Sequence, residues 1–348
     1  MWWKFRKHKL AVICSILIVA GYLVAAFCEF VAPVPLEHRR TAYAYAPPQR
    51  IHIFGPEGLS RPFVYGLKGK RDLETLRKIY REDRSQKYPI KLLVRGEPYR
   101  FWGLFTTDVH LFGVERGAPF FLLGTDSLGR DLLSRIIYGS RISLTIGLVG
   151  VLLSFIFGLT MGAISGYYGG WVDNLIQRAI EILRSFPAIP LWMALSAALP
   201  QTWTPLQVYF GVTVVLSFLG WTGLARVVRG RLLSLREEDF TTAAMLSGAS
   251  EWRIMRRHLL PSVSSHVIVS LTLAVPEMIL AETALSFLGL GLRPPVTSWG
   301  VLLKEASNVQ AVAQQPWLLI PVFFVIFTVL AFNFIGDGLR DAADPYAR

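Results

Sequence analysis

Long apolar runs separated by polar and basic segments set the pattern of this chain. A helix needs about 20 apolar residues to cross a hydrocarbon core of roughly 30 Å, and the apolar runs reach that length. They occupy residues 10–28, 142–168, 185–225, 262–292 and 317–336, and prolines at 200 and 205 divide the third run into two. The pattern predicts an all-α polytopic membrane protein with six transmembrane helices, because one buried core helix does not account for so many runs.

The first apolar run follows a basic stretch, as the apolar region of a cleaved signal peptide also does. The run is longer than a typical signal-peptide core, and no clear small-residue cleavage site follows it. We therefore expect residues 1–32 to form a cytoplasmic N-terminus and a retained first span. The second run is rich in Gly, Ser and Ala, which predicts close packing against other helices.

The segment 33–123 interrupts the membrane-like pattern and begins with four prolines. Residues 71–83 have the apolar spacing of a short amphipathic helix. Three stretches resemble strands: 51–54, 91–94 and 99–105. We predict a small α+β insertion between the first two spans, on the outer side of the membrane. It is either a decorative cap or a docking surface for an extracellular partner, and the sequence leaves both open.

The stretch 124–144, before the second span, combines glycines with charged residues. Asp126 is suited to a turn, in which glycines at 124 and 129 relieve backbone strain. We expect an amphipathic helix at the outer membrane interface to follow. Its acidic and basic side chains are spaced to pair with one another: Asp131, Arg135 and Arg141.

Composition supports the membrane assignment, because 53% of the residues are hydrophobic and only 17% are charged, against about 25% charged in soluble domains. Basic residues favour the cytoplasmic side of a membrane. Their placement puts both termini, the loop 173–184 and the loop 226–261 in the cytoplasm. Because this topology accounts for the net charge of +12, we expect no nucleic-acid partner.

No catalytic or metal-binding pattern is present. The two cysteines, Cys14 and Cys28, lie about 20 Å apart along one predicted helix, which is too far for a disulfide, and no zinc-ligand spacing accompanies them. The sequence lacks GxxxxGK[ST], GxSxG and HExxH. We expect no catalytic residue, no metal ligand and no cofactor bound by this chain, and a membrane enzyme with its chemistry in the insertion is disfavoured.

A polar, basic stretch over residues 238–261 stands between the fourth and fifth predicted spans. It predicts a helix over about 238–247, a break at Gly248, and a second helix that Ser250 caps and Pro261 ends. Small residues flanked by arginines suit an anionic lipid surface or a groove on a cytoplasmic subunit. Binding to DNA is disfavoured, because membrane spans hold the stretch at both ends.

This stretch resembles the EAA loop of permeases in binding-protein-dependent ABC importers. The Ala-Ala, Gly and Leu-Pro frame of that loop is matched by Ala243, Ala244, Gly248, Leu260 and Pro261. Thr242 stands in place of the loop's glutamate, which puts any ionic contact of that glutamate in doubt.

Four further stretches are similar, in order, to the C-type permease of dipeptide, oligopeptide and nickel importers: LGTDSLGRDLLSRIIYGSRISL, GYYGGWVD, LSFLGLGLRPPVTSWG and GDGLRDAADPY. The resemblance runs from about residue 121 to the C-terminus and also fits the first span. It implies the type I importer permease fold, with residues 124–348 as a core of five spans. The long insertion is not part of the resemblance.

The resemblance also implies partners in a bacterial inner membrane. These are a second homologous permease, two ATP-binding subunits that bind ATP and Mg, a periplasmic or lipid-anchored binding protein, and membrane lipid. Helices at 238–261 would transmit ATPase movements to spans that alternate between inward-open and outward-open forms. The residues expected to couple to the ATPase are Thr242, Ala243, Ala244, Gly248, Ala249, Ser250, Arg253, Leu260 and Pro261.

Three residues are candidates for the translocation pathway or its gate. Glu277 and Glu282 interrupt the fifth predicted span, and an ionisable residue within a membrane indicates a functional site by default. Glu282 lies in a family-like stretch, which favours a structural or gating role. Glu277 either faces the pathway, or snorkels to the membrane surface, or pairs with another subunit. Pro187 is suited to kink a gate at the inner start of the third span.

The solute is less sharply defined than the mechanism. Peptides are the default for the family, and oligosaccharides, opines or nickel are alternatives within the same mechanism. A stand-alone secondary transporter is an alternative of another class, although such proteins often have repeated halves and no internal repeat is evident here.

Overall fold

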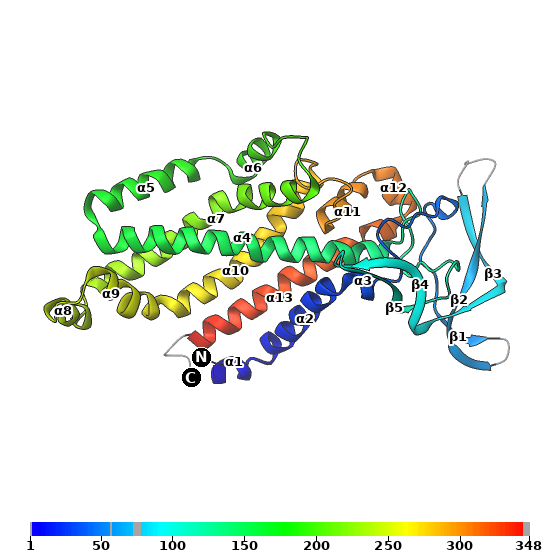
Figure 1. Ribbon diagram of the computed structural model, residues 1–348, viewed down its shortest axis with the longest axis horizontal. Coiled ribbons are helices and arrows are strands. Elements are labelled where there is room, and N and C mark those ends of the chain that lie inside the picture. The colour runs from blue at the N-terminus through cyan, green and yellow to red at the C-terminus, as the bar shows by residue number, and fades with distance from the viewer. Residues whose placement is uncertain (1, 56–57, 72–77, 344–348) are drawn as a thin grey trace. The chain divides into compact units, whose positions relative to one another are not determined.

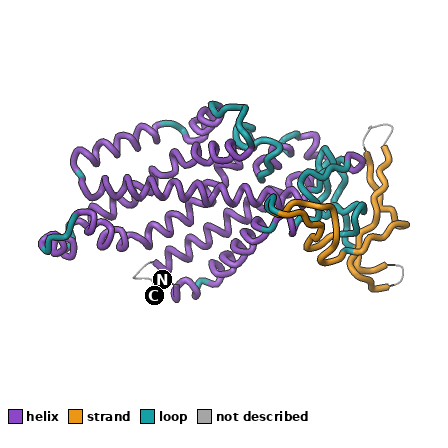
Figure 2. The backbone as a smooth tube through the Cα atoms, in the orientation of Figure 1, coloured by secondary structure: helices purple, strands orange, loops and turns teal. Residues whose placement is uncertain are grey.

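The computed structural model describes residues 2–55, 58–71 and 78–343 (Figure 1). The chain divides into two compact units. The first unit comprises Met1–Val19, Leu144–Pro295 and Val325–Arg348, and the second comprises Ala20–Ser143 and Val296–Phe324. Figure 2 shows the strands in orange, and all of them belong to the second unit.

The described residues of the first unit form helices and the loops that connect them. Besides parts of α2 (Lys9–Ala26), α4 (Leu132–Tyr168) and α13 (Ile320–Ala343), its helices are α1 (Trp2–Lys7), α5 (Gly170–Ser185), α6 (Ala188–Ala197), α7 (Pro205–Arg236), α8 (Asp239–Leu246), α9 (Glu251–Ile254), the π-helical turn η2 (Met255–Leu259) and α10 (Leu260–Phe287). A capping box begins α7, in which Thr204 N donates to Gln207 Oε1 at 2.8 Å.

Glycines on α4 allow α7 to approach closely. A Cβ atom at Gly162 would lie 2.6 Å from the carbonyl oxygen of Ala225, and one at Gly158 would lie 2.9 Å from that of Trp221. Small residues permit such backbone approach between helices in lipid, where no hydrophobic force drives association. The predicted close packing of the second span is thus confirmed.

Five helical segments of the described residues are long and apolar enough to cross a membrane: Lys9–Ala26, Leu132–Tyr168, Pro205–Arg236, Glu251–Phe287 and Pro316–Ala343. The third predicted span appears as the short α6 helix, whose ten residues extend only about 15 Å. The phenylalanine and proline at 186–187 separate it from α5, because the residue before a proline avoids helical backbone angles.

Antiparallel strands form most of the predicted insertion. The strands β1 (His52–Gly55), β2 (Gly58–Arg71) and β3 (Lys78–Pro89) form one sheet in that order, and β4 (Lys91–Phe101) pairs with β5 (Phe105–Gly113). The strand predictions at 51–54 and 91–94 are confirmed. The stretch 99–105 is instead the end of β4, a turn, and the start of β5.

The prediction of an amphipathic helix at 71–83 is wrong for residue 71 and residues 78–83, which the structure describes as strand. Residues 72–77 lie outside the described residues. Residues 78–83 belong to β3, in which Ile79 pairs with Lys70 and Tyr80 with Gly69. The Tyr80 hydroxyl donates to the carbonyl oxygen of Ala44 at 2.7 Å. Pairing with β2 therefore outweighs the local helical spacing.

The second unit also contains short helices and the start of α4. The short helices are α3 (Cys28–Val31), η1 (Thr41–Tyr43), α11 (Trp299–Glu305), α12 (Val309–Gln314) and η3 (Pro316–Leu319). The predicted interfacial helix before the second span is not separate, because α4 begins at Leu132 and continues into that span.

The turn that precedes α4 is held by a buried charge cluster. Asp126 accepts hydrogen bonds from the backbone N–H of Leu128 at 2.8 Å, as predicted for a turn residue. Its carboxylate also binds Arg130 and Arg135, each at 2.6 Å, and Glu305 binds Arg135 at 2.8 Å. The predicted pairing among Asp131, Arg135 and Arg141 is therefore wrong, because Arg135 pairs with Asp126 and Glu305, and Arg141 pairs with Glu29.

Candidate functional site

The stretch between α7 and α10 forms two short helices joined by a glycine turn (Figure 1). The backbone of Gly248 has φ +75°, a left-handed conformation that glycine adopts without strain. Its N–H donates to the carbonyl oxygen of Met245 at 3.0 Å, and the N–H of Ala249 donates to that of Ala244 at 3.1 Å. The predicted break at Gly248 is therefore present.

Buried apolar residues anchor the base of this turn within the first unit. Ile254, Met255 and Leu259 pack in one cluster with Val228 and Leu232 of α7. On α8, the buried Thr241 hydroxyl donates to the carbonyl oxygen of Leu235 at 2.8 Å. A movement of the turn would therefore be passed to α7 and α10 through packed side chains.

The outer face of the turn is apolar and basic. Leu246 is 85% exposed, and the exposed apolar residues beside it in the chain are Phe240, Met245 and Trp252. Three arginines of the same stretch are also exposed: Arg253, Arg256 and Arg257. We call these seven residues the coupling surface. Large apolar side chains clustered on a polar loop are typical of a surface that binds another protein.

The predicted coupling residues divide into exposed and partly buried positions, and one of them, Arg253, belongs to the coupling surface. Six are exposed: Thr242, Ala243, Gly248, Ser250, Arg253 and Pro261. Three are partly buried against the apolar cluster: Ala244, Ala249 and Leu260. The structure thus brings the expected residues together in one compact feature.

Two local predictions about this stretch need correction. Ser250 has the backbone position of an N-cap, but its side chain makes no capping hydrogen bond. Pro261 does not end the second helix, because the chain continues through η2 into α10. A π-helical turn shifts backbone hydrogen bonding from i−4 to i−5, which accommodates the missing N–H and the ring of the proline.

An ion pair that sequence reasoning missed ties α5 to α7. The carboxylate of Asp173 accepts hydrogen bonds from the Arg229 guanidinium and from the hydroxyl of Ser165 on α4. The Arg229 guanidinium holds the pKa of Asp173 below its usual range. The stretch GYYGGWVD contains Asp173, but nothing in its spacing identifies Arg229, which lies 56 residues further along.

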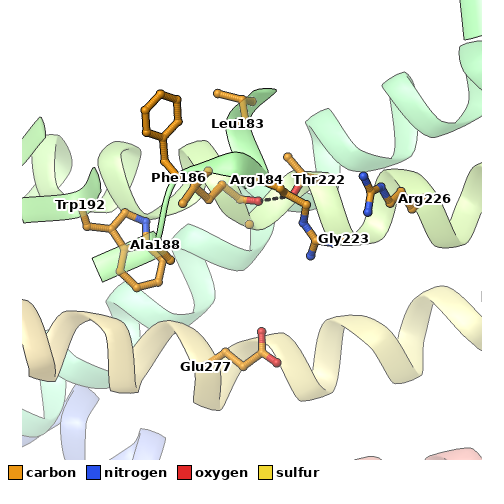
Figure 3. Close-up of a pocket in the computed structure, with 11 residues that line it drawn as sticks. Leu183, Arg184, Phe186, Ala188, Trp192, Thr222, Gly223, Arg226 and Glu277 are labelled. Atoms are coloured by element: carbon orange, nitrogen blue, oxygen red, sulfur yellow. Dashed lines mark hydrogen bonds between the residues drawn. The ribbon is translucent and has the colours of Figure 1, made fainter. Parts of the chain in front are cut away.

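A cavity of about 570 Å³ lies within the first unit, between α5, α6, α7 and α10 (Figure 3). Glu277 of α10 faces Arg184 and Arg226 across it (Figure 3). The remaining wall is mostly apolar and includes Phe186 and Trp192. The cavity therefore offers one acidic and one basic side to a ligand.

The other two pathway candidates do not line this cavity. Pro187 lies at the N-cap of α6, between two residues that do. Glu282 is fully buried, and its carboxylate accepts a hydrogen bond from the Ser286 hydroxyl at 2.8 Å. The oxygen of Ser286 accepts in turn from the N–H of Leu292 at 3.0 Å, so Glu282 supports the turn after α10. Within the described residues, no three His, Cys, Asp or Glu side chains gather as a metal site.

Two family models match the sequence. Residues 158–348 match the binding-protein-dependent transport system inner membrane component, and residues 1–48 match the N-terminal TM domain of oligopeptide transport permease C. The two matched regions cover both ends of the chain and leave out most of the β-rich insertion.

Curated relatives agree with these matches. The oligopeptide transport system permease protein OppC of Haemophilus influenzae is 45% identical over 65% of this chain and 70% of its own length. The dipeptide transport system permease protein DppC of Lactococcus lactis subsp. cremoris is 32% identical over 99% of this chain and 90% of its own length. The second alignment includes the insertion.

A solved structure shares the fold. A chain from inward facing conformations of the MetNI methionine ABC transporter aligns with a TM-score of 0.50 and 19% identity, and the match covers 61% of this chain and 98% of that chain.

Proposed function

Because this chain belongs to the family of inner membrane components of binding-protein-dependent transport systems, we propose that it is the permease subunit of an ABC importer for peptides. The likeness to oligopeptide and dipeptide permeases supports the solute class. The single observation that carries the mechanism is the coupling surface, an exposed apolar and basic face on a base packed into α7 and α10.

The coupling surface would dock an ATP-binding subunit. Leu246 and Trp252 supply apolar area and the arginines supply charge, as in the cores and rims of protein interfaces. The absent loop glutamate is replaced by Thr242, whose hydroxyl lies 3.5 Å from the carbonyl oxygen of Glu238. Docking by this chain would therefore rely on apolar contact and arginines, with no acidic contact at position 242.

The proposed complex contains two ATP-binding subunits, a second permease and a binding protein. ATP and Mg would be bound by the ATP-binding subunits, and this chain would bind no metal or cofactor and hydrolyse no ATP. Six crossings, with α6 contributing the third, would place both termini in the cytoplasm of a bacterial inner membrane. The insertion would then lie on the outer side.

The cavity beside α10 fits a peptide in transit. A peptide at neutral pH carries an ammonium and a carboxylate. Glu277 would meet the ammonium, and Arg184 and Arg226 would meet the carboxylate, while Phe186 and Trp192 contact side chains. Pro187, at the break between α5 and α6, would act as the hinge of the gate. Glu282 would keep the turn after α10 in place.

The test is the recovery of ATP-binding subunits with the purified permease. We expect Leu246→Asp to lower that recovery at least tenfold, because a carboxylate replaces a central apolar contact. Leu59→Asp is the matched control, since Leu59 of β2 is 76% exposed and lies outside the coupling surface. Equal recovery with both variants would overturn docking at this surface.

Transport assays separate the remaining candidates. In nanodiscs that contain the whole complex and its binding protein, peptides are expected to stimulate ATP hydrolysis, and oligosaccharides, opines and nickel are not. If transport proceeds in vesicles without any ATP-binding subunit, the chain is a secondary transporter and the proposal fails.

A further inference from the structure

The turn between β4 and β5 is apolar and exposed. It has the sequence Phe-Trp-Gly-Leu-Phe over residues 101–105, which we call the hairpin tip. Leu104 is 79% exposed, and Trp102 and Phe105 are also exposed. A hairpin tip in water is usually polar, with Asn, Asp or Gly, so an apolar tip needs a partner or a solvent that matches it.

Contacts within the second unit place the hairpin tip beside the end of the first span. The indole N–H of Trp102 donates to the carbonyl oxygen of Ala26 at 2.9 Å, and Ala26 is the last residue of α2. The ring of Phe101 stacks on that of Phe27 with centroids 6.0 Å apart. The tip is therefore level with the point where the apolar span ends.

A charge cluster holds the Trp102 ring in place. The guanidinium of Arg141 lies 4.4 Å from the ring centroid, a cation–π contact. Arg141 also donates to the carboxylate of Glu29 at 2.6 Å and to the carbonyl oxygen of Ala25 at 2.9 Å. At the base of the hairpin, the buried His110 ring has one nitrogen 2.6 Å from the carbonyl oxygen of Ala32.

The backbone at the tip is strained in a way that presents the aromatic ring. Trp102 has φ +49°, which bulky residues rarely adopt because it strains the backbone. Gly103 follows with φ +73°, which costs a glycine little. The hydrogen bond to Ala26 and the contact with Arg141 offset this strain, so the surroundings of Trp102 specify its orientation.

We propose that the hairpin tip inserts into the lipid headgroup and acyl boundary beside the end of the first span. Tryptophan is enriched at this boundary because its ring is apolar and its N–H is polar. Leu104 and Phe105 would enter the acyl region, and the exposed Arg100 would lie near lipid phosphates. Continuity with the apolar surface of α2 favours lipid over a protein partner as the occupant.

Spin labels test this insertion in the whole complex in lipid nanodiscs. Leu104→Cys and, as a control facing water, Leu59→Cys each receive a nitroxide; Leu59 has a similar exposed fraction but lies in the other sheet. Cys14 and Cys28 are both buried, and protein without an introduced cysteine measures any labelling at these positions.

Collisions of the nitroxide with oxygen, which enters lipid, and with a polar nickel chelate, which stays in water, are compared. We expect the oxygen-to-nickel collision ratio to be at least threefold higher at residue 104 than at residue 59. Equal ratios at the two positions would place the tip in water and overturn the proposal. Shielding of residue 104 from both reagents would show that protein covers it, which also overturns the proposal.

Discussion

Two turns of this chain have nearly the same glycine conformation in opposite surroundings. Gly129, in the turn before α4, has φ +71°, and Gly248, in the turn between α8 and α9, has φ +75°. A Cβ atom at Gly129 would lie 2.0 Å from the carbonyl oxygen of Arg40, whereas one at Gly248 would find nothing within 4 Å. The missing side chain of Gly129 lets the backbone at Arg40 approach, whereas the missing side chain of Gly248 faces open space.

The difference separates a glycine turn that is packed on all sides from one whose outer face is open to a partner. The backbone of Arg40 and Thr41 fills the space beside Gly129. In the same turn the buried carboxylate of Asp126 binds the buried guanidinium of Arg135. Around Gly248, only the base is packed, and the coupling surface faces outward. A docking partner would need open space beside Gly248, where the left-handed backbone favours glycine and no side chain fills the surface.

The largest effect is expected from Gly129→Ala. The new methyl group overlaps a backbone carbonyl that cannot rotate away, and the left-handed φ adds strain for alanine. We expect no monodisperse folded protein, as measured by fluorescence-detected size-exclusion chromatography in detergent. A variant that elutes and unfolds like the wild type would show that the turn is not locked.

The charge cluster should give the next largest effect. Arg135 is 2% exposed, and its replacement by Met leaves the buried carboxylate of Asp126 with one fewer cation. Breaking a buried ion pair costs about 3–5 kcal/mol, so we expect the unfolding free energy of Arg135→Met to fall by that amount.

The exposed pair between Arg178 and Glu181 provides the matched control. Arg178 is 79% exposed in this pair. Arg178→Met should change the unfolding free energy by about 0–1 kcal/mol, because water screens exposed pairs. Denaturant titrations of both variants in one detergent compare the losses directly, and losses of similar size would argue against burial as the cause.

We call the turn around Gly129, before α4, the locked turn. Its backbone conformation was predictable from neighbouring residues, but its ion pairs with residues far away in the sequence were not. Asp126 and the two glycines indicate a turn because short polar side chains and left-handed backbone are local properties. Glu305 lies 170 residues from Arg135, and Glu29 lies 112 residues from Arg141. Which carboxylate meets which arginine is decided by the packing of distant elements, for which one sequence carries no local signal.

The backbone of the turn between α8 and α9 was predicted more completely, because this turn is made almost entirely of residues that are neighbours in the sequence. Gly248 marks the break, but the large apolar residues of the coupling surface, such as Leu246 and Trp252, were not among the predicted coupling residues. The continuation of the helix through Pro261 was missed, because local rules treat proline as a helix end and do not foresee η2. The strand over Lys78–Pro89 was missed for the same reason as the ion pairs, since its partner β2 decides it.

Alanine at Gly248 should have a smaller, separable effect. The methyl group enters open space, so only the left-handed φ is costly, and we expect the unfolding free energy to fall by about 1–2 kcal/mol. Gly58 also has positive φ and open space, so Gly58→Ala should lose a similar amount.

Recovery of ATP-binding subunits then separates the two glycines. The methyl group of Gly248→Ala stands on the face that would meet the partner, so we expect reduced recovery with this variant. Recovery with Gly58→Ala should remain at the wild-type level. If both variants recover the subunits equally, the open space beside Gly248 has no role in docking.

The smallest effect concerns Asp131, the residue of the locked turn whose carboxylate is least well paired. Its Oδ2 accepts from the N–H of Ser134 at 2.7 Å, while its buried Oδ1 has no hydrogen-bond partner. Burial raises the pKa of Asp131 to about 6 from the ordinary 3.8. Between these pH values the folded state holds a proton that the unfolded state has lost, so stability falls as pH rises through this window.

Asp131→Asn should remove this pH dependence. From pH 5 to pH 7.5 the wild type should lose about 1 kcal/mol of unfolding free energy through Asp131 alone, and the variant should lose that much less. For each protein, the measured quantity is the change in unfolding free energy between the two pH values. Asparagine leaves its own polar atom at the Oδ1 position, but this changes stability equally at both pH values and cancels in the difference. An unchanged pH slope would mean that Asp131 is already ionised in the folded protein, and that the locked turn tolerates a buried charge that no arginine neutralises.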